Sequence, residues 1–446
     1  MSKTNVKVDG WCWVPRPDFT PAMEERVTIV GEVNPYKDEA PERKLFEFSD
    51  DRHWVAIPRT CISKILDARV ISNTVTNGNR RLPDFPMINL YGRWEEGKPN
   101  QVEAVAVIES ALRKRKGGIL HAPCGQGKTV CALELIRRMG VPTLVLVHKT
   151  FLMDQWEERI KEFLPDATVG RWQQDRCDNG DDFDIVLGMV QSLACDREYP
   201  EEVYRSFGMV VADEVHLMGA ATWCTAIPQF AARYRLGLTA TPDRRDGLED
   251  VFMLHIGNIE YVMEEPIRDY RICKVALSTH IPSRLYSDWE GKPHYSKLVS
   301  ALAADVPRTK AIAEYVRRAV ENDSRKVILF THRRAHVEEF VKLVKQMGIS
   351  VSAYMGGMKK EERKEAEQAQ VIVATVKQAK EGLDIPSLDT IILATPMGDP
   401  RQAIGRLRPG TEKVAVLLDF VDTEIGYCVG LWRKRRGYYV EKGYLE

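Results

Sequence analysis

Residues 118–129 read GILHAPCGQGKT, and the interpretation of the whole chain starts from this stretch. Gly118–His121 has the length and apolar character of a buried strand, and the apolar residues after Lys128 suit a helix. A loop between a strand and a helix presents backbone N–H groups to phosphates at the helix N-terminus. Lys128 would reach the β- and γ-phosphates of a nucleoside triphosphate, and Thr129 would ligate Mg²⁺. Because Ala122 stands where the general pattern has its first glycine, a chance turn is the alternative interpretation.

A second motif, DEVH at residues 213–216, directly follows the apolar run Met209–Ala212. Open α/β sheets bind ligands at the carboxyl ends of their strands, so these carboxylates are well placed for chemistry. Asp213 would hold Mg²⁺, and Glu214 would orient or deprotonate an attacking water. The alternative is a solvated acidic end of a strand.

A third motif lies far along the chain, where residues 402–408 read QAIGRLR. Arginines offered by another lobe can neutralise charge on a phosphoryl group in transfer. Taken alone, Arg406 and Arg408 would be interpreted as surface residues.

Apolar runs of strand length recur along most of the chain, and they are continuous rather than alternating. This texture is typical of parallel strands that are buried on both faces. The runs are Gly118–His121, Thr143–Val147, Asp184–Leu187, Met209–Ala212, Arg235–Leu238, Lys326–Phe330, Val371–Ala374, Thr390–Ala394 and Val414–Leu418. Helical stretches separate several of them, so the sequence predicts an α/β fold with two lobes of similar size.

The N-terminal part has a different texture, with short strands expected at Arg26–Val33, Leu45–Phe48 and Trp54–Ile57 and a helix at Cys61–Val70. We therefore expect a small mixed α+β domain at 1–87, the first lobe at 88–265, and a connector with the second lobe at 266–446.

The first helix of the first lobe is expected to run from Gln101 to about Lys116. Asn100 is a plausible N-cap, with Glu103 as its capping-box partner. The basic run 113–116 suits the negative end of this helix dipole better than a nucleic-acid patch.

Composition narrows the class of protein. The 64 basic residues balance 64 acidic ones, which excludes binding of nucleic acid by global attraction alone but leaves local basic tracks open. The nine cysteines are scattered and odd in number, so we expect reduced thiols, no zinc site and a cytoplasmic location. We expect no membrane span and no secretory signal.

Taken together, DEVH after the APCGQGKT loop, then LTATP at 238–242 and the distal QxxGR, resemble the superfamily 2 helicases. Residues 89–446 can be laid on that pattern in the right order. The stretch GLTATPDRRDG at 237–247 and the connector PIRDYRI at 266–272 resemble the XPB, RadD and UvsW branch, and most closely the UvsW-type branch-migration enzymes.

The resemblance implies two RecA-like lobes, ATP and Mg²⁺ as cofactors, and roles for particular residues. Gln101 would contact adenine, and His216, Thr239 and Thr241 would couple hydrolysis to movement of the lobes. The implied nucleotide-binding residues are Gln101, Cys124, Gly125, Gln126, Gly127, Lys128, Thr129, Gly382 and Asp384, with Thr129 and Asp213 holding Mg²⁺. The implied nucleic-acid contacts are Lys149, Thr150, Gln191, Ser192, Thr331, Arg333 and Thr375, where hydroxyls, amides and cations suit phosphates.

One departure from the family pattern concerns the last motif. The family usually spaces it QxxGRxxR, whereas here Arg408 comes one residue early and Pro409 follows it. Arg406 is therefore the better candidate for the arginine finger, and Arg408 either reaches the nucleotide or forms a salt bridge.

The function that this resemblance implies is an ATP-dependent DNA helicase or translocase that remodels branched DNA by branch migration or fork reversal. Duplex or branched DNA would be its partner, together with recombination or replication proteins. Three alternatives stay open: an RNA helicase, the motor subunit of a nuclease complex, and a nucleotide-gated binding module without productive hydrolysis.

Two further segments are left with two interpretations each. The N-terminal domain either binds DNA or merely supports the first lobe, and the cations and aromatic rings of Arg52, His53, Trp54, Arg59, Arg80 and Arg81 favour DNA binding. Residues 432–439, WRKRRGYY, either bind a nucleic-acid strand or pack as a terminal helix on the second lobe.

Overall fold

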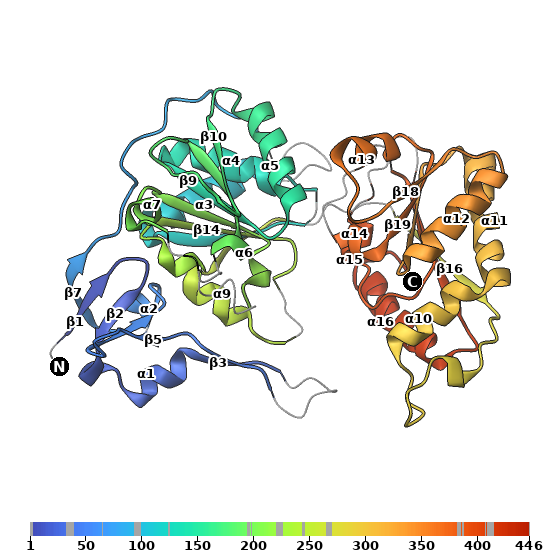
Figure 1. The fold of residues 1–446 in the computed structure, drawn as a ribbon, viewed down its shortest axis with the longest axis horizontal. Helices are drawn as coiled ribbons and strands as arrows, with labels where there is room; N and C mark the ends of the chain where they lie inside the picture. The colour runs from blue at the N-terminus through green and yellow to red at the C-terminus, as the bar shows by residue number, and fades with distance from the viewer. Residues whose placement is uncertain are drawn as a thin grey trace. The chain divides into compact units, whose positions relative to one another are not determined.

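The computed structural model describes residues 3–32, 40–64, 66–92, 100–123, 125–193, 197, 199–219, 226–242, 246–264, 270–380, 385, 388–405, 407 and 414–445. The chain divides into two compact units, unit 1 (Met1–Pro266) and unit 2 (Ile267–Glu446), whose elements are labelled in Figure 1. None of the helices formed by the described residues has the length and apolar character needed to span a lipid bilayer.

The beginning of unit 1 forms a mixed sheet of strand order β5-β6-β2-β1-β7, called the N-terminal sheet (Figure 1). Its pairings are antiparallel except for β1 with β7, which is parallel. The elements are β1 (Thr4–Val8), β2 (Cys12–Pro15), η1 (Arg16–Asp18), α1 (Pro21–Arg26), β5 (Glu47–Phe48), β6 (Trp54–Ile57), α2 (Cys61–Lys64) and β7 (Ala68–Asn73), while β3 (Thr28–Val30) and β4 (Glu42–Lys44) form a separate antiparallel pair.

Several expectations for this part of the chain are wrong. The predicted helix at Cys61–Val70 ends at Lys64, and strand β7 begins at Ala68. The predicted strand Arg26–Val33 shortens to β3, and strands β1 and β2 were missed. Strands β1 and β2 form an antiparallel hairpin whose turn contains Asp9 and Gly10, a local turn signal that the sequence interpretation overlooked. The parallel partner of β1, strand β7, comes from about sixty residues further on and has no such local signal.

The N-terminal sheet is fastened to the rest of unit 1 by a shared core and by buried arginines. Its apolar residues pack with Leu248 and Val251 at the start of α9 (Glu249–His255). The Arg59 guanidinium donates to the carbonyl oxygens of Ala232 at 2.8 Å and Arg233 at 3.2 Å. Arg235 is fully buried and donates to the carbonyl of Gly10. Arg59, which was expected to contact DNA, therefore forms its hydrogen bonds to carbonyl oxygens within unit 1.

The main sheet of unit 1 has the order β11-β10-β12-β9-β13-β14-β8-β15, and every pairing but β10 with β11 is parallel among the described residues. Its strands are β8 (Gly117–His121), β9 (Thr143–Val147), β10 (Val169–Gln173), β11 (Arg176–Cys177), β12 (Ile185–Met189), β13 (Met209–Asp213), β14 (Tyr234–Thr239) and β15 (Ile259–Val262). Its helices are α3 (Gln101–Arg115), α4 (Lys128–Met139), α5 (Thr150–Phe163), α6 (Val190–Leu193), α7 (Glu201–Arg205), α9, η2 (Val215–Gly219) and η3 (Ile227–Gln229).

Alternate residues of these strands enter two different cores. Leu120 and Val145 pack against α3, α4 and α5, whereas their neighbours Ile119 and Leu144 pack with η3 and α9 on the opposite face. Both faces are buried, which explains why the runs are continuously apolar. Because the strands are parallel, the carboxyl ends of β8, β9, β12, β13 and β14 meet at one edge of the sheet.

Helix α3 shows how local sequence sets these elements. It begins after Asn100, whose side-chain oxygen accepts from the N–H of Glu103 at 3.1 Å, as the capping pattern predicts. It ends at Arg115, and Lys116 takes the left-handed conformation with φ 64°. Arg113 pairs with Glu109 and Arg115 pairs with Glu260, so these two cations of the basic run serve contacts within unit 1.

Unit 2 contains a parallel sheet of order β16-β21-β20-β17-β19-β18. Its strands are β16 (Tyr270–Leu277), β17 (Val327–Thr331), β18 (Val351–Tyr354), β19 (Val371–Thr375), β20 (Thr390–Leu393) and β21 (Ala415–Asp422). Its helices are η4 (Ser283–Leu285), α10 (Tyr295–Ala304), α11 (Val306–Asp323), α12 (Arg334–Gln346), α13 (Lys360–Ala366), α14 (Val376–Lys380), α15 (Arg401–Ile404) and α16 (Gly426–Glu441).

The connector expected before this lobe contains an integral strand. Strand β16 pairs with β21 over its whole length at the edge of the sheet. Its residues alternate between buried and more exposed positions, so the segment lacks the continuous apolar run by which the inner strands were found.

The basic and aromatic segment 432–439 forms part of α16, and two of its side chains point inward. Arg435 is fully buried and its Nε donates to Asp419 at 2.7 Å, while the Tyr439 hydroxyl donates to the same carboxylate at 3.1 Å. Tyr439 belongs to a core of unit 2. For these residues the packing interpretation holds, and the segment stabilises unit 2.

We predict that Asp419→Asn lowers the free energy of unfolding of unit 2 by about 3–5 kcal/mol, because the Arg435 charge stays buried without its counter-ion. Denaturant unfolding followed by circular dichroism measures the loss. Asp323→Asn is the matched control, since the Asp323 carboxylate that pairs with Arg325 is exposed, and it should cost less than about 1 kcal/mol. Equal costs for the two variants would contradict the assigned role of Asp419.

Candidate nucleotide and nucleic-acid sites

The phosphate loop of unit 1 lies between the end of β8 and the start of α4. Gly125 and Gly127 both have positive φ, at 79° and 83°, which glycine adopts without strain. A Cβ on Gly127 would lie 2.1 Å from the Gln101 amide nitrogen, so a side chain here would displace the end of the Gln101 side chain. The loop therefore leads into the N-terminus of α4 without a side chain at Gly127.

Gln101 joins this loop to the beginning of α3. It is buried, and its amide nitrogen donates to the carbonyl of Gln126 at 3.1 Å. Its amide oxygen accepts from the backbone N–H of Tyr91 at 3.2 Å. Gln101 was predicted to contact adenine, and the geometry gives it a positioning role for the phosphate loop as well.

Lys128 and Thr129 form the first turn of α4, at the positive end of its dipole. The Lys128 ammonium donates to the carbonyl of Ala122 at 3.2 Å. Ala122 is itself bonded through its N–H to the carbonyl of Thr239 at the end of β14, at 2.9 Å. The Lys128 side chain thus lies over the loop that it is predicted to serve.

Asp213 ends β13 in a buried position close to this loop. One of its carboxylate oxygens accepts from the Trp156 indole N–H at 2.9 Å, and the other accepts from the backbone N–H of Glu214 at 3.0 Å. Burial, followed by the nearby Glu214 carboxylate, raises the pKa of Asp213 to about 6. The Trp156 hydrogen bond and the Lys128 charge act in the opposite direction, and a divalent cation would favour the ionised form further.

Glu214 and His216 continue the chain beyond β13. Glu214 has φ 54°, a left-handed conformation that is uncommon for a side-chain-bearing residue and is often found at functional sites. The His216 Nδ1 lies 3.4 Å from a Glu214 carboxylate oxygen and 3.0 Å from the Thr239 hydroxyl. The Thr239 hydroxyl in turn accepts from the Thr241 N–H at 3.1 Å. His216 therefore connects the candidate water-orienting carboxylate to the end of β14.

Trp156 was not found by the sequence interpretation, because only the tertiary fold brings α5 to Asp213. We predict that Trp156→Phe lowers ATP turnover at limiting Mg²⁺ by about 10–100-fold, since the bond that orients a candidate metal ligand is lost. Steady-state hydrolysis over a Mg²⁺ titration measures this effect. Trp172→Phe is the control, because the buried Trp172 indole N–H has no partner among the described residues. An equal loss in both variants would point to packing instead.

The predicted strand contacts of unit 1 lie beyond the carboxyl ends of β9 and β12. The Thr150 hydroxyl accepts from the Gln173 amide at 3.1 Å, and the Gln191 amide donates to the carbonyl of His148 at 3.0 Å. The Ser192 hydroxyl accepts from the backbone N–H of Gln174 at 3.1 Å. Lys149 directly precedes α5. These elements are adjacent in the sheet, so the four predicted residues share one edge.

The three predicted contacts of unit 2 differ in accessibility. Thr331 is fully buried, and its hydroxyl lies 2.8 Å from Nδ1 of His336, so its side chain does not reach the surface. That prediction is corrected, because the strand end turns this hydroxyl into the core between β17 and α12. The Arg333 guanidinium donates to the hydroxyls of Ser300 and Ser296 on α10. Thr375 ends β19 in a half-buried position.

Five predicted residues lie outside the described part of the chain: Cys124, Gly382, Asp384, Arg406 and Arg408. The helix α15 precedes Arg406, and its Arg401 pairs with Asp399 at 2.9 Å. Among the described residues, no group of three or more His, Cys, Asp or Glu side chains is arranged to hold a metal ion by itself. A metal at Asp213 would therefore need the nucleotide's phosphates and water as further ligands, as is usual for Mg²⁺.

The residues present fit a nucleoside triphosphate with Mg²⁺. The two glycines with positive φ, the N-terminus of α4 and Lys128 suit the phosphates, and the raised pKa of Asp213 reflects a buried carboxylate that a cation would stabilise. Thr129 and Asp213 would hold the metal, and Gln101 the base. A parallel sheet with these groups at its carboxyl edge defines the class of P-loop nucleotide-binding α/β proteins.

Comparison with known proteins narrows this class. Residues 95–244 match the family model described as "Type III restriction enzyme, res subunit", and residues 309–408 match "Helicase conserved C-terminal domain". The chain belongs to the superfamily 2 helicases, and its two sheets are RecA-like lobes. Helicase domains imply the use of ATP.

Relatives differ in the nucleic acid that their names specify. The Acanthamoeba polyphaga mimivirus protein L396, named as an ATP-dependent RNA helicase, is 29% identical over 357 residues that cover 78% of this chain and 68% of L396. The "DNA 3'-5' translocase XPB2" of Sulfurisphaera tokodaii is 28% identical over 373 residues, covering 72% and 80%.

Two solved structures are similar to this chain over most of its length. The Pyrococcus furiosus Hef helicase domain is 16% identical, with a TM-score of 0.48 over 75% of this chain and 97% of its own. The T4 UvsW structure is 18% identical, with a TM-score of 0.40 over 99% of this chain and 98% of its own.

Proposed function

We propose that this helicase is an ATP-dependent DNA translocase that remodels branched DNA. The observation that carries the proposal is the attachment of the N-terminal sheet to the main sheet of unit 1, which is the first helicase lobe. The shared core and the Arg59 and Arg235 hydrogen bonds hold the sheet in a fixed place within unit 1. A fixed accessory domain can hold one duplex arm while the motor acts on another, which is what movement of a branch point requires.

The geometry of unit 1 supports the following roles for its residues. Lys128 and the N–H groups at the start of α4 would bind phosphates, while Asp213 and Thr129 would hold Mg²⁺. Bound ATP supplies the phosphoanhydride bond whose cleavage drives the motor. Glu214 orients a water and accepts its proton at a carboxylate oxygen, and His216 relays the state of Glu214 to Thr239 and β14. The assignment of Arg406 as the arginine finger rests on the sequence and stays a prediction.

DNA is proposed over RNA on sequence grounds. The motif GLTATPDRRDG and the connector that follows it resemble the XPB branch, and the XPB2 relative is named as a DNA translocase. An RNA helicase is the second candidate, because the mimivirus relative is named as one.

Nucleic-acid stimulation of ATP hydrolysis separates the two candidates. We expect four-way junction DNA and duplex DNA to raise the turnover rate at least about tenfold, and a matched RNA duplex to raise it less than about twofold. The physical reason is that closure of the two lobes around ATP depends on the nucleic-acid strand that they bind. Stimulation by RNA alone would favour the RNA helicase.

A further inference from the structure

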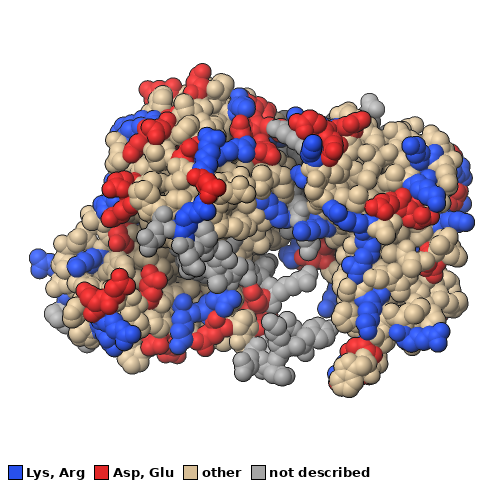
Figure 2. Space-filling model, in the orientation of Figure 1, with Lys and Arg blue, Asp and Glu red and all other residues tan. Residues whose placement is uncertain are grey.

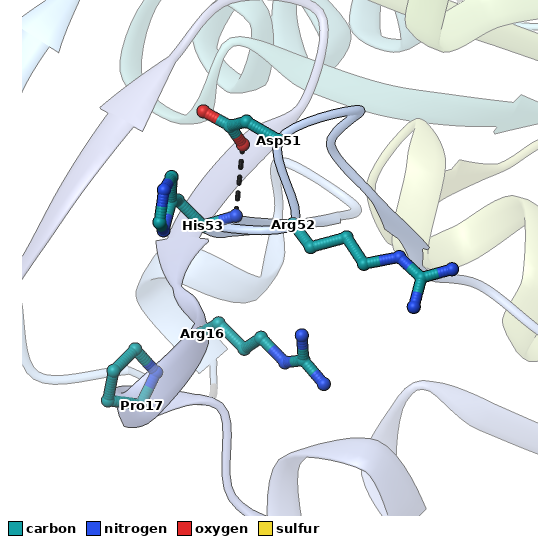
Figure 3. A pocket seen from close by; sticks show the side chains of 5 residues that line it. All are labelled: Arg16, Pro17, Asp51, Arg52 and His53. Atoms are coloured by element: carbon teal, nitrogen blue, oxygen red, sulfur yellow. Dashed lines mark hydrogen bonds between the residues drawn. The ribbon is translucent and has the colours of Figure 1, made fainter.

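A hollow of about 500 Å³ lies on the N-terminal sheet, away from the predicted nucleotide site. It is lined by Arg16, Pro17, Asp51, Arg52 and His53 (Figure 3). Two loops build it: η1, which follows β2, and the turn 49–53 between β5 and β6. The backbone N–H of Arg16 donates to the carbonyl of His53 at 2.9 Å, so the two loops are fastened together.

The turn between β5 and β6 is held by its own side chains. The Ser49 hydroxyl donates to Asp51 at 2.6 Å, and the Asp51 carboxylate also accepts from the backbone N–H of His53 at 2.9 Å. These bonds lower the pKa of Asp51, with the Ser49 bond as the largest cause. The Asp51 charge is therefore directed into its own turn.

Arg52 occupies a conformation that side-chain-bearing residues rarely adopt, with φ 53°. Within the part of the chain that the structure describes, no carboxylate forms an ion pair with Arg16 or Arg52. Figure 3 shows both arginine side chains extending in the same direction from their two loops, with His53 and Pro17 directed to the other side. Both arginines thus line the same hollow, and neither forms an ion pair with a carboxylate of the described residues.

Aromatic rings accompany the cations on this part of the sheet. The Arg16 guanidinium lies 5.3 Å from the centre of the Phe48 ring, and the Lys7 ammonium lies 3.9 Å from the centre of the Trp54 ring. Over the visible face of unit 1, basic and acidic side chains lie among one another (Figure 2). Arg80, by contrast, pairs with Asp184 at 2.8 Å and donates to the carbonyl of Gly180 at 3.0 Å.

We propose that Arg16 and Arg52 form a binding site for a backbone phosphate of a duplex DNA arm. Guanidinium groups bind phosphates through paired hydrogen bonds, and such contacts position a duplex without reading its sequence. The proposal rests on the proposed function and deepens it, since the site would let the N-terminal sheet bind a duplex arm that the helicase lobes do not contact.

The test uses the full-length chain with Arg16→Gln, Arg52→Gly and the double variant. Glycine takes the positive φ of residue 52 readily, so Arg52→Gly removes the guanidinium and preserves the turn. Arg69→Gln is the matched control, because Arg69 is exposed on β7 at the opposite edge of the same sheet. Circular dichroism and thermal melting verify that each variant is folded.

Affinity for fluorescent duplex and four-way junction DNA is measured over a series of salt concentrations. The slope of log affinity against log salt should fall by about one for each arginine removed, and the double variant should bind at least about tenfold more weakly at low salt. Arg69→Gln should match the wild type. Inorganic phosphate should compete no better than chloride at equal ionic strength, because the site needs an extended backbone.

Unchanged affinity and slope in the double variant would overturn the proposal, and so would an equal loss in Arg69→Gln. Effective competition by inorganic phosphate would also overturn it, by pointing to a free-anion site. If the wild type fails to dissociate a junction while DNA binding still depends on Arg16 and Arg52, the phosphate site stands and only the proposed function falls.

Discussion

Glu214→Gln should reduce ATP turnover by about 10²–10⁴-fold while leaving ATP affinity nearly unchanged. Glutamine has the same shape as glutamate but cannot accept the proton of the attacking water at a carboxylate. Asp213, Lys128 and the glycines of the loop, which are proposed to hold the nucleotide, are untouched. Phosphate release measures turnover, and calorimetric titration measures binding.

The control for this charge removal is Glu202→Gln, because Glu202 is exposed on α7 of the same lobe and should behave as the wild type. Turnover of Glu214→Gln within about threefold of the wild type would contradict the assigned base. A loss of ATP binding instead would mean that Glu214 acts on the nucleotide directly.

Lys128→Ala should give a different pattern, in which ATP affinity and turnover are both lost. The ammonium is proposed to contact the β- and γ-phosphates, and removing one such preorganised donor costs about 10²–10³-fold in rate. The variant should still fold, because the Lys128 ammonium donates a hydrogen bond to the Ala122 carbonyl and its side chain is only half-buried. Equilibrium binding of a fluorescent ATP analogue and steady-state hydrolysis separate the two effects.

Lys114→Ala serves as its control, since Lys114 is exposed on α3. If Lys128→Ala bound ATP normally and lost only turnover, Lys128 would act solely on the transition state. Normal binding together with normal turnover would place the nucleotide elsewhere.

The inner strands of both lobes could be predicted because both of their faces are buried. Thr143–Val147 has the predicted bounds, and Val371–Thr375 is one residue longer than predicted, since a continuous apolar run leaves few alternatives. The α/β class of the fold is likewise confirmed. Strand β10, which lies between the short edge strand β11 and β12, was missed: it contains Arg171, which pairs with Asp154 on α5. Only the tertiary neighbour makes a charged residue compatible with such a strand.

In the candidate site too, features within one segment could be predicted, whereas contacts between distant segments could not. Candidate residues such as Lys128 and Glu214 could be proposed from local sequence, because each lies within one contiguous motif at a loop or a strand end. Contacts between distant segments could not, among them Trp156 with Asp213 and Gln101 with the Gln126 carbonyl. Thr331 shows the opposite error, because a hydroxyl at a strand end can turn inward when a buried histidine offers a partner.

Remodelling of branched DNA is tested most directly by ATP-dependent dissociation of a synthetic four-way DNA junction. A tailed DNA duplex and a matched RNA duplex serve as parallel substrates, and Glu214→Gln serves as the variant without turnover. We predict that the wild type dissociates the junction faster than the tailed duplex and leaves the RNA duplex intact, and that Glu214→Gln dissociates none of them. Unwinding of the RNA duplex with the junction left intact would contradict this function and leave a helicase that acts on RNA.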